Sequence, residues 1–252
     1  FDISEGSLFH VGYIHGYEDG SCRVHFCFHH LIIDAVSWRI LTEDLQTMYR
    51  DLVEGNTRPE YTKGSSYRQW VDVVKTYKQD SPSSREEELR YWRDIVEHTK
   101  NSSLHIEGLS SSSYHHSDLV LDKYTTSRLL RDIHGVYHTQ INDVLLSALS
   151  LSLCDFTGLS VHSIVLEGHG REDIFKGMDI TETVGWFTSM YPIVLERGKD
   201  LFSTVVHTKD SLRGIPNHGI GYGSLIGYTD GNLPGISFNY LGQLDQQESV
   251  TG

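Results

Sequence analysis

The stretch FHHLIIDAVSW, residues 28–38, sets two adjacent histidines and an aspartate in a run that is otherwise largely apolar. His29 and His30 follow residues 22–28, in which polar and apolar residues alternate as they do in a β-strand. Asp34 comes four residues after His30, immediately before a helical pattern. The stretch therefore predicts a strand that ends at two imidazoles and turns into a helix.

Three interpretations of His29, His30 and Asp34 are open at this point. In a structural interpretation one histidine is buried and hydrogen-bonded and the other is exposed, which is the usual arrangement for an arbitrary HH dipeptide. A metal site needs three or more ligands in one geometry, and no His or Cys cluster elsewhere in the sequence completes one. A catalytic interpretation rests on the ability of histidine to exchange protons near neutral pH. Asp34 would then either orient an imidazole or pair with an arginine.

Composition excludes several classes of protein. The chain has 252 residues, 38% of them hydrophobic, and a formal net charge of −13, which argues against unaided binding to nucleic acid or to an anionic membrane. No apolar run is long enough to span a bilayer, and the first residues lack the features of a signal peptide. The three cysteines have no metal-type spacing, so a reducing, cytoplasmic location is expected.

Apolar spacing along the rest of the chain predicts a mixed α/β (α+β) fold without a regular βαβ repeat. Trp38, Leu41, Leu45, Met48 and Leu52 have the spacing of one apolar stripe and predict a helix that ends at Gly55. Further helices are expected at about 66–78, from 84 to 96, at 125–136, 139–154 and 201–213. Strands are expected at 7–15, 22–28, 118–122, 161–167, 191–195 and 235–240.

A serine-rich stretch divides the chain. Residues 99–117 contain seven serines and little periodicity, which is typical of a linker or an exposed crossover. We therefore expect two lobes, residues 1–98 with the HHxxxD pattern and residues 118–252 with the later motifs.

A second group of residues that could take part in catalysis lies in LEGHGRE, residues 166–172. Two glycines there predict a tightly turned backbone after a strand. Glu167 stands at the end of that strand, where a rigid scaffold presents side chains to a cleft. Taken alone, it would be an ordinary carboxylate of a surface loop.

The stretches HHLIIDAVSW, LEGHGRE, TVGWFTSMYP, PNHGIGYG and SFNYLGQLD, in this order, resemble the epimerization domains of nonribosomal peptide synthetases. These domains belong to the condensation-domain superfamily, whose two-lobed fold resembles chloramphenicol acetyltransferase. HHxxxD is shared with condensation domains and simpler acyltransferases, whereas EGHGRE and FNYLGQ resemble epimerization domains in particular. The resemblance covers nearly the whole chain.

The resemblance implies an isomerase that inverts the α-carbon of an aminoacyl or peptidyl thioester. A thioester acidifies its α-proton only weakly, so a base must lie close to it. By family analogy His30 and Glu167 form the acid/base couple, one from each lobe at a tunnel. His29, Asp34, Tyr191 and Asn239 are then supporting residues.

The resemblance also implies partners. The substrate would be carried on the 4'-phosphopantetheine arm of a peptidyl carrier protein, with adenylation and condensation domains as neighbours, and without a cofactor or metal of the domain's own. Relatives carry a segment before the point that matches Phe1, so we expect an incomplete N-terminal lobe and a 252-residue chain that is inactive and aggregation-prone by itself. The alternatives are a condensation domain, which forms peptide bonds, and a catalytically silent relative that only docks carrier proteins.

Overall fold

The structure, a computed structural model, describes residues 1–56, 63–79, 82–102, 104, 114–133, 135, 138–229 and 232–242. The chain forms two compact units. The first consists of Phe1–Thr76 and His169–Thr188, and the second of Tyr77–Gly168 and Ser189–Gly252. These units do not coincide with the expected lobes, and much of the expected crossover at 99–117 lies outside the described residues, so the division into lobes stays a prediction.

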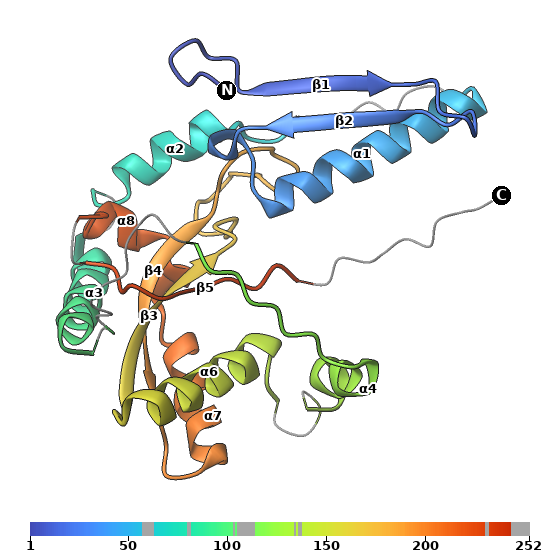
Figure 1. The fold of residues 1–252 in the computed structure, drawn as a ribbon. Helices are drawn as coiled ribbons and strands as arrows, with labels where there is room; N and C mark the ends of the chain where they lie inside the picture. The colour runs from blue at the N-terminus through green and yellow to red at the C-terminus, as the bar shows by residue number, and fades with distance from the viewer. Residues whose placement is uncertain are drawn as a thin grey trace. The chain divides into compact units, whose positions relative to one another are not determined.

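The first unit begins with a hairpin. Strands β1 (Phe9–Ile14) and β2 (Arg23–Phe28) pair antiparallel, as expected from the alternating pattern. A short 3-10 turn, η1 (His30–Ile32), leads from β2 into helix α1 (Ala35–Glu54), which ends at Gly55 with φ of 73°. This left-handed conformation is one that glycine adopts without strain, and it confirms the expected helix end. Helix α2 (Tyr67–Thr76) follows (Figure 1).

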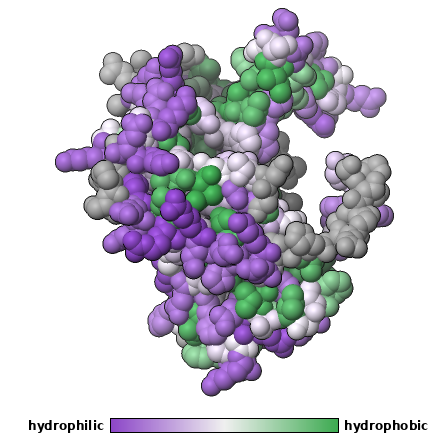
Figure 2. Space-filling view, turned by 90° about the vertical axis from the view of Figure 1, so that its left-hand side faces the viewer, coloured by the Kyte–Doolittle hydropathy of each residue, from purple (hydrophilic) through white to green (hydrophobic). Residues whose placement is uncertain are grey.

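The apolar stripe of α1 is only partly buried. Trp38 and Leu41 are half-buried, but Leu45, Met48 and Leu52 are 44%, 39% and 62% exposed, so the second half of the stripe faces solvent in the described structure. Exposed apolar side chains also occur on the hairpin, and Figure 2 shows green hydrophobic atoms at its top, at the height where Figure 1 draws the hairpin.

The second unit is built on a three-stranded sheet. Strand β3 (Val161–Gly168) lies in the centre, antiparallel to β4 (Ser189–Glu196) and parallel to the short β5 (Ser237–Phe238). All three strands lie within the ranges that apolar spacing predicts or extend them by a few residues. Five consecutive residues of β3, from 162 to 166, are buried, which indicates a strand covered on both faces.

Helices cover both faces of this sheet. Helix α3 (Pro82–Ser102) lies on one side of β3 and β4, and α6 (Ile141–Thr157) with α7 (Leu201–Arg213) lies on the other (Figure 1). Adjacent residues of β3 point to opposite faces, as a strand requires. His162 contacts Thr157 of α6 at 2.7 Å, whereas Ser163 contacts Ser102 of α3 at 2.7 Å. The buried run in β3 follows from this two-sided packing.

The remaining elements of the second unit are short. Helix α4 (Lys123–Ser127) continues into a π-helical turn, η2 (Arg128–Asp132), and the 3-10 turn η3 (Pro216–Gly219) precedes α8 (Gly221–Leu225). Residues 118–122 were expected to form a strand, but they form none. Leu119 and Val120 are 88% and 89% exposed, and a strand forms only where a neighbouring strand pairs with it. Within the described residues, no helix is both long and apolar enough to cross a membrane.

Burial of His162 makes the stability of the second unit dependent on pH. The side chain is 1% exposed, and its burial lowers the pKa of His162 below the ordinary value of 6.5. Because the folded pKa is the lower one, the stabilisation is complete above pH 6.5 and is lost as the pH falls. The free energy of unfolding should therefore decrease on acidification, by up to about 1.4 kcal/mol per pH unit between the two pKa values.

The measurement is a series of denaturant titrations between neutral and mildly acidic pH. His162→Gln should flatten the slope, whereas His115→Gln, which alters an exposed imidazole, should leave it unchanged. Equal slopes for the His162 variant and the parent chain would contradict this assignment.

Candidate active site

Asp34 is the buried carboxylate at the start of α1. It is 4% exposed and occupies the N-cap position, where its Oδ1 accepts a hydrogen bond from the backbone N–H of Ser37 at 2.7 Å. Its Oδ2 accepts another from the backbone N–H of Phe187 at 3.1 Å. Asp34 therefore caps the N-terminus of α1 and, at the same time, binds the backbone of Phe187, which is distant in sequence.

Arg171, from the LEGHGRE stretch, is the partner of Asp34. Its Nη2 lies 3.2 Å from Asp34 Oδ1, and the two side chains are only 6% and 4% exposed. Its Nη1 donates to the carbonyl oxygens of Ile180 and Thr183 at 3.0 and 2.6 Å, and the guanidinium lies 4.0 Å from the centre of the Phe187 ring. Of the roles considered for Asp34, the structure shows the pairing with an arginine.

Ser37 completes this network. It is fully buried, and its hydroxyl donates to the carbonyl oxygen of Gly185 at 2.9 Å and accepts from the Gly185 N–H at 3.0 Å. The same oxygen accepts from Arg171 Nη2 at 2.9 Å. The first turn of α1 is therefore joined to residues 169–188 by backbone and side-chain bonds that include a buried ion pair.

The two histidines occupy different environments. His29 is half-buried and caps η1, because its Nδ1 accepts a hydrogen bond from the backbone N–H of Leu31 at 3.1 Å. His30 is exposed, and its ring lies 5.2 Å from the ring of Trp186. His29 thus has a structural contact, while the imidazole of His30 is accessible and is flanked by an aromatic ring.

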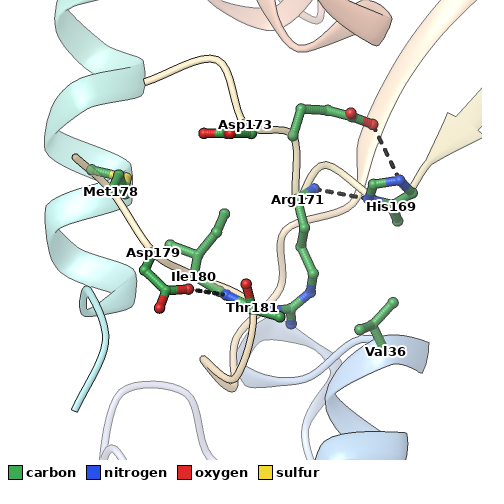
Figure 3. Close-up of a pocket in the computed structure, with 9 residues that line it drawn as sticks. Val36, His169, Arg171, Asp173, Met178, Asp179, Ile180 and Thr181 are labelled. Atoms are coloured by element: carbon green, nitrogen blue, oxygen red, sulfur yellow. Dashed lines mark hydrogen bonds and ion pairs between the residues drawn. The ribbon is translucent and has the colours of Figure 1, made fainter. Parts of the chain in front are cut away.

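A pocket of about 640 Å³ lies beside this network in the first unit. It is lined by Val36 of α1 and by residues between His169 and Thr181, including the carboxylates of Glu172, Asp173 and Asp179. Figure 3 shows the Arg171 side chain extending from its loop toward the start of α1. The pocket therefore shares Arg171 with the network around Asp34.

Glu167 lies in the second unit, near the end of β3. It is half-buried, and its Oε2 accepts a hydrogen bond of 2.6 Å from Asn239 Nδ2. Strand register explains this contact. Leu166 pairs with Phe238 in the parallel β3–β5 ladder, so Glu167, which follows Leu166, lies beside Asn239, which follows Phe238. Two motifs far apart in sequence thus meet at one carboxylate.

Tyr191 supports the same end of β3 from the neighbouring strand. It is 5% exposed, pairs across the ladder with Leu166, and packs against Trp92 with ring centres 5.8 Å apart. The structure brings Glu167, Asn239 and Tyr191 together in one unit, and His29, His30 and Asp34 together in the other. The expectation that His30 and Glu167 face each other stays a prediction.

Arg171, Ser37 and Trp186 are site residues that the sequence did not single out. Arg171 and Trp186 lie in two of the motifs that carried the resemblance, and a search for a cationic partner of Asp34 within those motifs would have found Arg171. Ser37 gave no comparable signal, because a serine in the first turn of a helix has many ordinary roles.

Known proteins show the family of this fold. The model of the condensation domain matches residues 1–251, and the chain belongs to this family. It is 39% identical to bacitracin synthase 3 of Bacillus licheniformis over 96% of the chain, and 36% identical to surfactin synthase subunit 1 of Bacillus subtilis over 99%. It covers only 4% and 7% of these two proteins, so it matches a small part of each.

Solved structures agree with this assignment. The epimerization domain from the third module of tyrocidine synthetase B matches 95% of this chain and 57% of its own, with a TM-score of 0.73 and 35% identity. The first condensation domain of the calcium-dependent antibiotic synthetase, at 18% identity and a TM-score of 0.62 over 84% of this chain and 46% of its own, shows the shared fold. The predicted mixed α/β fold of the chloramphenicol acetyltransferase type is confirmed.

Removal of the Asp34 carboxylate should destabilise the first unit strongly. Asp34→Ala leaves the guanidinium of Arg171 buried without its charge partner, and such a change costs about 3–5 kcal/mol. The free energy of unfolding from denaturant titration is the measurement.

The matched control is Asp132→Ala. Asp132 pairs with Arg128 at 3.8 Å on the surface, where its side chain is 65% exposed, so its loss should change stability by less than about 1 kcal/mol. A similarly small effect of Asp34→Ala would show that the buried pair is not what holds residues 169–188 to α1.

Proposed function

We propose that this chain epimerizes the α-carbon of an aminoacyl or peptidyl thioester. The substrate is held on the phosphopantetheine arm of a carrier protein during nonribosomal peptide synthesis. Support comes from membership of the condensation-domain family and from the similarity to an epimerization domain at 35% identity.

The observation that carries the proposal is the hydrogen bond between Asn239 and Glu167. EGHGRE and FNYLGQ are the two stretches that resemble epimerization domains in particular, and it is these two that meet at the Glu167 carboxylate. A carboxylate held by a neighbouring amide keeps one orientation, which a group that moves a proton at a defined carbon requires.

The chemistry needs one group to remove a proton and another to return one. The Cα–H bond breaks, the proton passes to a base, and the electron pair is delocalised into the thioester carbonyl as an enolate. A second group then protonates the opposite face of Cα, so that inversion is complete and no cofactor is consumed. In this proposal, Glu167 and His30 are the two groups, and each must reach the same α-carbon.

The environments of the supporting residues fit this division of roles. His30 is exposed beside Trp186, whereas His29 is engaged as a cap by the Leu31 N–H. Asp34 is saturated by Arg171 and by backbone N–H groups, so it holds the scaffold rather than exchanging protons. The second histidine of the pair is therefore the one proposed to act on substrate.

Condensation, in which a peptide bond forms between two carrier-bound substrates, is the second candidate. It is favoured by the match of the family model and by the HHxxxD pattern of residues 29–34, which condensation and epimerization domains share. It gives no role to the contact between Glu167 and Asn239, and for this reason we place it second.

The proposal includes partners and a location. The carrier protein that presents the thioester is the direct partner, and adenylation and condensation domains are the proposed neighbours, because the relatives named above are peptide synthases many times longer than this chain. No cofactor is required by the proposed chemistry. The free thiols of Cys22, Cys27 and Cys154 fit a reducing compartment, and the proposed location is the cytoplasm.

The test uses the intact polypeptide that carries residues 1–252, with an L-aminoacyl thioester loaded on its carrier protein. The substrate should become a mixture of D and L forms and should take up deuterium at Cα from deuterated water. His30→Ala and Glu167→Gln should each slow racemisation by about 10²–10⁴-fold, the usual contribution of a general acid or base. Chiral chromatography and mass spectrometry measure the two quantities.

Two exposed residues of α3 provide matched controls. Glu86→Gln and His98→Ala make the same kinds of change away from the proposed site and should leave the rate unaltered. Formation of a peptide bond with retained configuration, and no α-proton exchange, would instead support the condensation candidate.

A further inference from the structure

A buried polar cluster that the proposed chemistry does not use lies between α3 and the PNHG turn. We call it the Glu88 cluster: Tyr77, Arg85, Glu88 and Asn217. Glu88 is 4% exposed and Tyr77 is fully buried, and the Tyr77 hydroxyl donates to Glu88 Oε2 at 2.9 Å. Arg85 Nη1 lies 3.0 Å from the same carboxylate oxygen and donates to the Tyr77 hydroxyl oxygen at 2.6 Å.

Within this cluster, a cation and a hydrogen-bond donor both face the Glu88 carboxylate. Burial, followed by the hydrogen bond to Glu88, raises the pKa of Tyr77, so the phenol keeps its proton and remains a donor. Arg85 supplies the positive charge that a buried carboxylate requires. Trp92 Nε1 lies 3.4 Å from the second oxygen of Glu88, Oε1. Such a network keeps one geometry, because each change of partner would leave a buried polar group unsatisfied.

Asn217 links this network to a strained turn. Its Nδ2 donates to the Tyr77 hydroxyl at 2.9 Å and to Glu88 Oε2 at 3.1 Å. Asn217, His218 and Gly219 have φ of 45°, 51° and 82°, so three successive residues adopt the left-handed region. Residues other than glycine enter this region at a cost, which the surrounding structure must offset. Here the two amide hydrogen bonds of Asn217 do so.

Glycines in the turn and at the start of α8 each approach a side chain too closely for a β-carbon. A β-carbon at Gly219 would overlap the ring of Tyr191, and one at Gly221 would overlap the Glu88 carboxylate. The backbone of the turn therefore lies against the Tyr191 ring, and Asn217 of the same turn is bonded to the Glu88 cluster.

Tyr191 transmits this position to the proposed active site. Its ring would lie 3.5 Å from a β-carbon at Gly168, the residue after Glu167, so it is in contact distance of the end of β3. Its neighbour in β4, Met190, is the cross-strand partner of Glu167. A shift of the Tyr191 ring would thus move the strand end that carries the carboxylate.

We propose that the Glu88 cluster positions Glu167, by fixing the PNHG turn against Tyr191 and so the end of β3. Its members are positioning residues, since none is placed in contact with substrate. This inference rests on the proposed epimerase function, because it gives Glu167 the role of one of two proton-transfer groups.

Asn217→Gly is the decisive variant. Glycine accepts the left-handed backbone without strain but removes both amide hydrogen bonds, so the turn loses its anchor while the fold is retained. Inversion needs both proton-transfer groups in place, whereas exchange with retention needs only the group on one face. Displacement of Glu167 should therefore slow inversion by about 10²-fold. Exchange with retention should slow much less for the enantiomer whose α-proton is removed by the other group, His30.

The experiment measures the ratio of deuterium uptake at Cα to inversion in the intact polypeptide, with L- and D-aminoacyl thioesters on the carrier protein. Glu88→Gln keeps the shape of the side chain but removes its charge. Like Asn217→Gly, it should raise the ratio of exchange to inversion. Glu87→Gln, an exposed neighbour on α3, is the matched control and should leave the ratio unchanged. Circular dichroism and the unfolding midpoint show that each variant is folded.

A cluster with a merely structural role would lower exchange and inversion in equal proportion, following the folded fraction, and that result overturns the inference. An unchanged ratio in a folded Asn217→Gly variant overturns it as well. Both results are distinct from failure of the proposed function, in which the unaltered polypeptide exchanges no α-proton.

Discussion

The carboxylate of Asp34 and the guanidinium of Arg171 make the contact on which the first unit depends, because neither charge is stable away from water without the other. Ser37 and the backbone of Phe187 bond to the same pair, so residues 169–188 and the start of α1 are fixed together. Loss of either partner would leave an uncompensated buried charge, which is strongly unfavourable. The joining of these two segments sets the position of Trp186 beside His30.

The second unit depends on a different constraint, the burial of β3 on both faces. Helices α3 and α6 contact alternate side chains of this strand, so its register cannot slip without exposing apolar residues to water. The same register aligns β5 with the end of β3 and brings Asn239 to Glu167. The geometry of the carboxylate is thus a consequence of how the core is packed.

Both units place a proposed proton-transfer group where a strand ends, and segments that are distant in the chain contact each of these groups. His30 follows β2 and meets a ring from residues 169–188, while Glu167 is held by β5 and lies beside Tyr191. Of the supporting side chains, Asp34 and Tyr191 are buried, His29 is half-buried and Asn239 is exposed. His30 is exposed and Glu167 is half-buried, so both proposed reactive groups are at least partly accessible.

Local patterns in the sequence predicted most of the secondary structure, and its motifs predicted the family. The hairpin, α1 with its stop at Gly55, β3 and α7 follow from local periodicity and from turn chemistry, which act over a few residues. These patterns did not determine which helix faces are covered or whether 118–122 forms a strand, because burial and pairing depend on partners elsewhere in the chain. The pairing of Arg171 with Asp34 and of Asn239 with Glu167 depends on the folded chain, since both contacts join residues that local spacing does not relate.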